Sequence, residues 1–119
     1  MKLFGSAGAL GLLLGVCLGA FAAHGLKSEF SPEMLGVFQT GVKYQMYHSI
    51  ALLVVAILAH KGNLFRYAGM FYIGGIIFFS FSLYVLALTG IIWVAYLTPF
   101  GGVSFLVGHL FLLLGFLKG

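Results

Sequence analysis

The side chains most able to do chemistry in this sequence are a few polar groups set within apolar segments. His48 is preceded by Tyr44 and Gln45, at i−4 and i−3, so a helix would place all three on one face. Imidazole titrates near neutral pH, and a polar cluster inside a membrane is a candidate site for a ligand or a proton. The simpler interpretation is a hydrogen-bonded clamp that fixes the orientation of neighbouring helices.

A second candidate group closes the first apolar segment, where His24 is followed closely by Lys27. In a four-span arrangement this end lies on the same side of the membrane as the start of the second span. His24 could then meet Tyr44, Gln45 or His48, although a histidine here can also simply complement the dipole of its own helix. We therefore treat His24, Lys27, Tyr44, Gln45 and His48 as one candidate polar site, with a purely structural role as the alternative.

His109 lies about midway along the last apolar segment, at a depth comparable with that of His48. Two such histidines could ligate a haem, but paired polar histidines in a helical bundle need no cofactor to explain them. Ser80, Ser82 and Tyr84 in the third segment can bond to neighbouring helices or to their own carbonyls. We expect no cofactor and no metal.

Motifs for catalysis are missing from the sequence. It contains no Ser-His-Asp set, no Cys and His cluster with metal-ligand spacing and no phosphate-binding loop. We therefore expect a protein that is not an enzyme, and no small-molecule substrate can be identified.

The composition places these side chains in a lipid bilayer. Of the 119 residues, 62% are hydrophobic and 7% are charged, whereas a soluble domain carries about 25% charged residues to hydrate its surface. The 18 glycines agree with membrane helices, in which glycine is common. The net charge of +4 comes from scattered Lys and Arg residues without a basic run, so nucleic acid is not an expected partner.

Four apolar segments are long enough to cross a bilayer and predict a single all-α domain of residues 1–119, a compact bundle of four transmembrane helices. The expected spans are residues 3–24, 41–60, 67–89 and 99–117. A signal peptide, cleaved after a small residue near Ala22, is the alternative for the first segment.

Two connections carry local signals. Ser31 and Pro32 predict a helix start, so residues 32–40 should form a short interfacial helix or the exposed beginning of the second span. Residues 67–117 contain no charged side chain and are too many for one crossing. We expect the chain to break between Thr98 and Gly102, with Pro99 opening the last helix.

Small residues recur at every fourth position of the first segment, from Ala7 to Ala23. This spacing makes a stripe along which a second helix can approach closely. We expect Gly11, Gly15 and Gly19 to pack against another helix of the same chain, and a contact between two copies is the alternative.

Basic residues predict the orientation. One side of a four-span protein would carry Lys2, Lys61, Arg66 and Lys118. The other side would carry Lys27 and Lys43 together with both acidic residues. Because basic residues favour the cytoplasmic side, we expect a multi-pass protein of the cell (inner) membrane with both termini in the cytoplasm.

Four blocks of the sequence, in order along the chain, are familiar. They are FAAHGLK at 21–27, TGVKYQMYH at 40–48, FSFSLY at 79–84 and TPFGG at 98–102. Together they resemble the YgdD/YwdK-like family of small bacterial inner-membrane proteins, a domain of unknown function. The resemblance covers essentially the whole chain and implies a multi-pass membrane protein, with no catalytic residues to carry over. His109 stands where an aromatic residue is expected in the family, which weakens the haem hypothesis.

These observations favour a membrane protein that acts through helix–helix contacts, as an accessory or assembly component of a membrane complex. Its partners would be the lipid bilayer and either other copies of the chain or a larger complex. The alternative is a small oligomeric transporter or channel that uses the polar site near His24, Tyr44, Gln45 and His48. Such a protein would need a hydrated cavity that reaches these side chains.

Overall fold

The computed structural model describes residues 2–25 and 28–118, and it is a bundle of four helices that are long and apolar enough to cross a membrane. This confirms the predicted all-α membrane fold. In chain order the elements are α1 (Lys2–His24), α2 (Pro32–Leu58), the 3₁₀ turn η1 (Ala59–Lys61), α3 (Asn63–Gly75), the π-helical η2 (Ile76–Ser80), α4 (Phe81–Thr89), the 3₁₀ helix η3 (Ile92–Leu97) and α5 (Thr98–Lys118).

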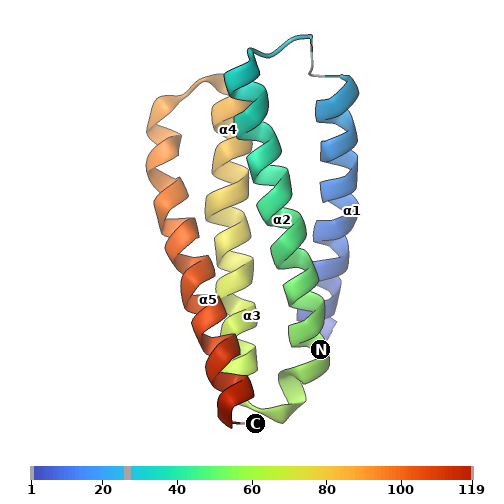
Figure 1. The fold of residues 1–119 in the computed structure, drawn as a ribbon, viewed down its shortest axis with the longest axis vertical. Helices are drawn as coiled ribbons and strands as arrows, with labels where there is room; N and C mark the ends of the chain where they lie inside the picture. Colours follow the sequence, from blue (N-terminus) through green and yellow to red (C-terminus); the bar gives the residue numbers. More distant parts are fainter. Residues whose placement is uncertain (1, 26–27, 119) are drawn as a thin grey trace.

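The bundle is antiparallel and flattened, with extents of 48 × 26 × 19 Å. Helix α1 packs on α2, which packs on α3 and α4, and α5 packs on α3 and η2 (Figure 1). Helices α1 and α5 therefore form the two edges, and both ends of the chain lie at the same end of the bundle (Figure 1). The long axis is close to the roughly 40–45 Å thickness of a bilayer with its headgroups.

The second span differs from the prediction of a separate interfacial helix. Helix α2 begins at Pro32 and continues without a break to Leu58, so residues 32–40 are the exposed beginning of the span. The Ser31 side chain caps this start by accepting the Met34 N–H at 3.1 Å. The Thr40 hydroxyl bonds back to the Gly36 carbonyl at 2.9 Å within this continuous helix.

The break before the last span also lies elsewhere than predicted. The chain turns at Gly90, which adopts a left-handed conformation with φ 71°, and at the extended Ile91. A glycine without a Cβ accepts this conformation at little cost. From Ile92 the chain is helical again, so Pro99 lies in the first turn of α5 and Gly101 lies inside that helix rather than in a loop.

The third span is not a uniform α-helix. Between α3 and α4 the chain widens into the π-helical η2, where the Phe81 N–H donates to the Ile76 carbonyl five residues earlier. One extra residue in a turn changes which side chains face the neighbouring helices, and such bulges are often found at functional sites. No signal for this feature was recognised in the sequence.

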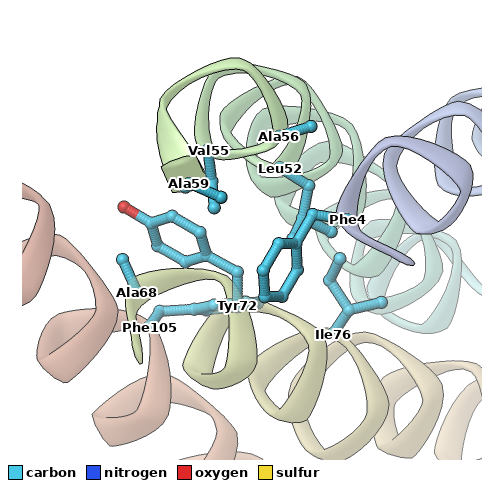
Figure 2. Packing of buried hydrophobic residues seen from close by; sticks show 9 residues of the cluster. All are labelled: Phe4, Leu52, Val55, Ala56, Ala59, Ala68, Tyr72, Ile76 and Phe105. Carbon is cyan, nitrogen blue, oxygen red and sulfur yellow. The ribbon is translucent and has the colours of Figure 1, made fainter. Parts of the chain in front are cut away.

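The buried apolar side chains form two clusters at the two ends of the bundle. The larger one lies toward the chain termini and joins α1, α2, α3, η2 and α5; Figure 2 shows its members Phe4, Leu52, Val55, Ala56, Ala59, Ala68, Tyr72, Ile76 and Phe105. The smaller one, near the opposite end, consists of Ala22, Phe38, Tyr84 and Ala87. The segment of the bundle between these clusters is where the buried polar side chains lie.

The small-residue stripe of α1 faces α2. A Cβ added to Gly11 would collide with the side chain of Ser49, and one added to Gly15 would collide with that of Met46. Gly19 has more room, with Val42 at 3.4 Å from such a Cβ. Within this chain the stripe is therefore covered by α2. Helix α2 can approach α1 this closely because these glycines have no side chains.

Gly101 supplies a test of this packing, because a Cβ there would overlap backbone atoms of Phe78 and Phe79 in η2. We expect Gly101→Ala to lower the free energy of unfolding in mild detergent by about 1–3 kcal/mol, as overpacking does. Gly102→Ala is the matched control, since its Cβ would lie 3.9 Å from the Phe79 ring, and alanine favours the helix equally at both positions. Equal stability of the two variants would show that α5 does not pack on η2 in this way.

Candidate functional site

The buried polar side chains gather in one layer of the bundle. They are Gln45, His48, Ser49, Ser80 and Ser82, each no more than 4% exposed. Gln45, His48 and Ser49 lie along α2 between Phe38 of the smaller cluster and Leu52 of the larger one, whereas Ser80 ends η2 and Ser82 lies in the first turn of α4. We call them the polar layer. In a bilayer such groups are costly unless another part of the protein satisfies them.

Gln45 connects three helices through its amide. Its Nε2–H donates to the Gly11 carbonyl of α1 at 2.8 Å. Its Oε1 accepts the hydroxyl of Tyr84 of α4 at 2.6 Å. The contact with α1 requires close approach, and Gly11 provides it because it has no side chain. Gln45 therefore fixes the spacing and rotation of α1, α2 and α4 together.

His48 connects α2 to two further helices through a chain of hydrogen bonds. Its Nδ1 lies 2.7 Å from the Tyr44 carbonyl, one turn earlier in α2. Its Nε2 lies 3.0 Å from Nε2 of His109 in α5. The Nδ1 of His109 lies 2.7 Å from the hydroxyl of Tyr72 in α3. The imidazole pair thus ties α2 to α5 and, through Tyr72, to α3.

If the His48 and His109 rings are both uncharged, this series of hydrogen bonds allows one self-consistent placement of the hydrogens. The Tyr44 carbonyl can only accept, so His48 Nδ1 carries a hydrogen and His48 Nε2 is an acceptor. His109 Nε2–H then donates to that acceptor, and its Nδ1 accepts from the Tyr72 hydroxyl. Both nitrogens of both rings are used, which explains how His109 can remain exposed at the surface of the bundle.

Aromatic side chains surround the His48 ring. It stacks on Phe105 of α5 with centroids 3.5 Å apart and ring planes at 8°, and Tyr72 lies 5.5 Å away. The Tyr44 ring lies 6.1 Å from the His48 ring and 6.5 Å from Phe105, so it flanks both, and it also contacts Phe79 at 5.0 Å. This apolar setting holds the ring in one orientation.

The serines of the polar layer mostly bond across helices. Ser80 Oγ donates to the Gly41 carbonyl at 2.8 Å, which joins η2 to α2. Ser82 Oγ lies 2.6 Å from the hydroxyl of Thr98, at the start of α5, and 2.8 Å from the Phe79 carbonyl. In residues 2–25 and 28–118, Ser49 Oγ is the one buried side-chain oxygen or nitrogen without a hydrogen-bond partner.

The structure brings only part of the sequence-predicted site together. Gln45 and His48 point into the bundle, whereas the Tyr44 side chain is 38% exposed and contributes its carbonyl. His24 ends α1, and Gly11 is the α1 residue level with Ser49. At 1.5 Å per residue, His24 lies about 20 Å along the helix from that level, so it does not join the cluster. Lys27 lies outside the described residues.

Sequence reasoning missed how the partners pair. The sequence pattern does not single out Tyr72, although it is fully buried and bonds to His109. Tyr84 was noted, but its bond to Gln45 depends on the rotation of α4 after η2. The signal that the sequence offers is a tyrosine within an apolar membrane segment. In the fold, Gly41 of α2 makes room for the Tyr84 ring.

The geometry does not suit a haem held between the two histidines. The two Nε2 atoms that would face an iron face each other at hydrogen-bond distance, which leaves no room for the metal between them. In the part of the chain that the structure describes, no three His, Cys, Asp or Glu side chains group together as metal ligands would.

A cavity of about 180 Å³ lies beside the polar layer, between α1 and the third span. Gln45 is its polar lining residue, and the other lining residues, among them Leu10, Ile73 and Phe81, are apolar apart from Gly11. The amide of Gln45 is already engaged by Gly11 and Tyr84. This cavity suits an apolar occupant better than a column of water.

The chain is similar to known membrane proteins. A family model described as a protein of unknown function (DUF423) matches residues 18–102. The UPF0382 membrane protein YwdK of Bacillus subtilis is 43% identical over 122 residues, which cover 99% of this chain and 98% of the relative. The UPF0382 membrane protein SAB0533 of Staphylococcus aureus is 42% identical over 119 residues, with the same coverage. No solved structure matches.

The bond between Tyr84 and Gln45 can be tested by removing one hydroxyl. Tyr84→Phe leaves the buried Gln45 Oε1 without its donor, so we expect the free energy of unfolding in detergent to fall by about 1 kcal/mol. Tyr47→Phe, on a side chain that is 57% exposed, is the matched control and should change it little. If the two variants were equally stable, Gln45 would not depend on Tyr84.

Proposed function

We propose, on the premise that this chain belongs to the DUF423 family of membrane proteins, that it is a non-enzymatic component of a larger membrane assembly. Membership in that family confirms the resemblance found in the sequence blocks. The names of the relatives state a membrane protein and no activity. The argument for an assembly role therefore rests on the side chains of this chain.

The observation that carries the proposal is that four of the five side chains of the polar layer form hydrogen bonds within the chain, Ser49 being the exception. Gln45, His48, Ser80 and Ser82 all bond to other groups of the chain. A transport route would instead present polar groups to water along the bundle. With most of these polar groups bonded internally, the bundle offers its outer helix faces to other molecules.

Helix α1 is the best candidate for such a face. It lies at one edge of the bundle and packs mainly on α2 (Figure 1). Its outward side chains include Leu13 and Val16, each 62% exposed. Membrane helices associate through van der Waals packing of such surfaces. We assign α1 as the contact for a transmembrane helix of the assembly.

A photo-crosslinking experiment in the native membrane tests this assignment. A photoreactive residue at Leu13 or Val16 should give a discrete protein adduct. The same residue at Leu106 of α5, which is 69% exposed, is the matched control and should give none. An adduct at twice the mass of the chain would make the assembly a homo-oligomer, and adducts with lipid alone would contradict the proposal.

A transporter or channel is the second candidate, favoured by one observation. The hydrogen-bonded chain from Tyr72 through His109 to His48 is a path along which a proton can move between neighbouring nitrogens. This candidate replaces the first if crosslinking gives lipid adducts alone and His48→Ala slows proton flux into proteoliposomes. Equal flux with and without the imidazole would remove it.

We further propose that the chain resides in the cell membrane with both termini in the cytoplasm. Lys61 ends η1, Arg66 lies in the first turn of α3 and Lys118 ends α5. The α2–α3 connection and both chain ends lie at the same end of the bundle (Figure 1). Both acidic residues, Glu29 and Glu33, lie at the opposite end. Basic residues are retained on the cytoplasmic side.

Reporter fusions at the C-terminus test this orientation. Green fluorescent protein should fluoresce there, and alkaline phosphatase, which needs the oxidising exterior, should be inactive. The reverse pair of results would place both termini outside.

A further inference from the structure

A cleft of about 570 Å³ opens at the end of the bundle that carries both termini. It lies between the α2–α3 connection on one side and the last turn of α5 on the other. Lys61, Asn63 and Lys118 supply polar lining, and Leu58, Phe65 and Phe116 supply apolar lining. The cleft is far from the polar layer, and nothing in the preceding sections gives it a role.

The inner wall of the cleft is apolar and fixed. Phe65 is 5% exposed and meets the ring of Phe116 edge-on, with centroids 5.3 Å apart. Gly115 lets α5 come close here, since a Cβ at that position would lie 2.8 Å from the Phe65 ring. Because Gly115 has no side chain, the Phe65 ring packs directly against α5 and forms a fixed wall of the cleft beside the more exposed Phe116 ring.

The rim of the cleft is positively charged. Lys61 and Lys118 are both exposed, and Arg66 stands one turn into α3 beyond them. Arg66 Nε donates to the Ala59 carbonyl at 3.3 Å, which holds this guanidinium against the connection. The two acidic side chains of the protein lie at the opposite end of the bundle, so neither can neutralise the rim.

A basic rim above an apolar wall, at the level of the membrane surface, matches one kind of occupant. Lysines at helix ends keep their ammonium groups at the headgroups and their stems along apolar surface. Basic pockets between membrane helices bind anionic headgroups. A free phosphate would use the rim alone, whereas a phospholipid would also place its first methylene groups against Phe65 and Phe116.

We propose that this cleft is a binding site for an anionic phospholipid, with the headgroup phosphate held by Lys61 and Lys118 and the upper acyl chain packed on Phe65 and Phe116. The site selects against zwitterionic lipids, whose own positive group would meet the two lysines. It stands independently of the assembly role, because it uses neither the outer face of α1 nor the polar layer.

Native mass spectrometry of the full chain, released from mixed phosphatidylglycerol and phosphatidylethanolamine, tests the site. The wild-type protein should retain phosphatidylglycerol in preference. The double variant Lys61→Gln/Lys118→Gln should lose about fivefold in retained phosphatidylglycerol for each lysine removed. Lys2→Gln/Lys43→Gln, which removes two charges outside the cleft, is the matched control and should retain it.

The remaining outcomes decide whether the cleft, net charge alone or binding of a free anion explains the retained lipid. Lys61→Arg/Lys118→Arg should keep the lipid, since the charge remains at the same positions. Equal loss in both glutamine pairs would overturn the site in favour of net charge alone. If millimolar glycerol phosphate displaced the lipid or stabilised the protein as well as phosphatidylglycerol does, the cleft would bind a free anion and the lipid proposal would fail.

Discussion

Lipid cannot hydrogen-bond to a buried amide or imidazole, so the amide and imidazole groups inside this bundle need partners within the chain. Gln45 and His48 show what that requires. The amide of Gln45 is shared between a carbonyl of α1 and the Tyr84 hydroxyl of α4. The imidazole of His48 is shared between its own helix and His109 of α5. Helix α2 carries both residues and is therefore the element around which the other helices are set.

Close approach of the backbones makes these bonds possible. Gly11 admits α2 to the carbonyl that Gln45 needs, and Gly41 brings its own carbonyl within reach of Ser80. Gly101 lets α5 touch the backbone of η2, beside which Ser82 meets Thr98. The π-helical turn belongs to the same arrangement, because it shifts Ser80 and the residues after it relative to α3. In each case a glycine allows two helices to approach closely, and a polar side chain nearby forms a hydrogen bond between them.

The two ends of the bundle differ from its middle and from each other. Away from the termini, Glu29 and Glu33 lie near the start of α2 and Lys43 lies about 15 Å further along that helix, so charge is mixed. At the end with the termini, Lys61 and Lys118 border an open cleft. The middle of the bundle has its polar side chains mostly bonded within the chain, and the end with the termini carries a cleft bordered by lysines. This arrangement suits a protein that contacts other molecules through its outer helix faces and at the membrane surface. It suits a continuous polar passage less well.

The sequence by itself determined the membrane environment, the four crossings and the start of α2, because hydropathy over about 20 residues and the capping by Ser31 are local properties. It also singled out Gln45 and His48, since a polar residue in an apolar segment is visible without a fold. Only the tertiary structure decided that α2 is continuous from Pro32, that the chain turns at Gly90, and that His48 pairs with His109 while His24 stays apart. Those outcomes depend on how far each helix is rotated and how closely its neighbour approaches, and residues distant in the sequence set both.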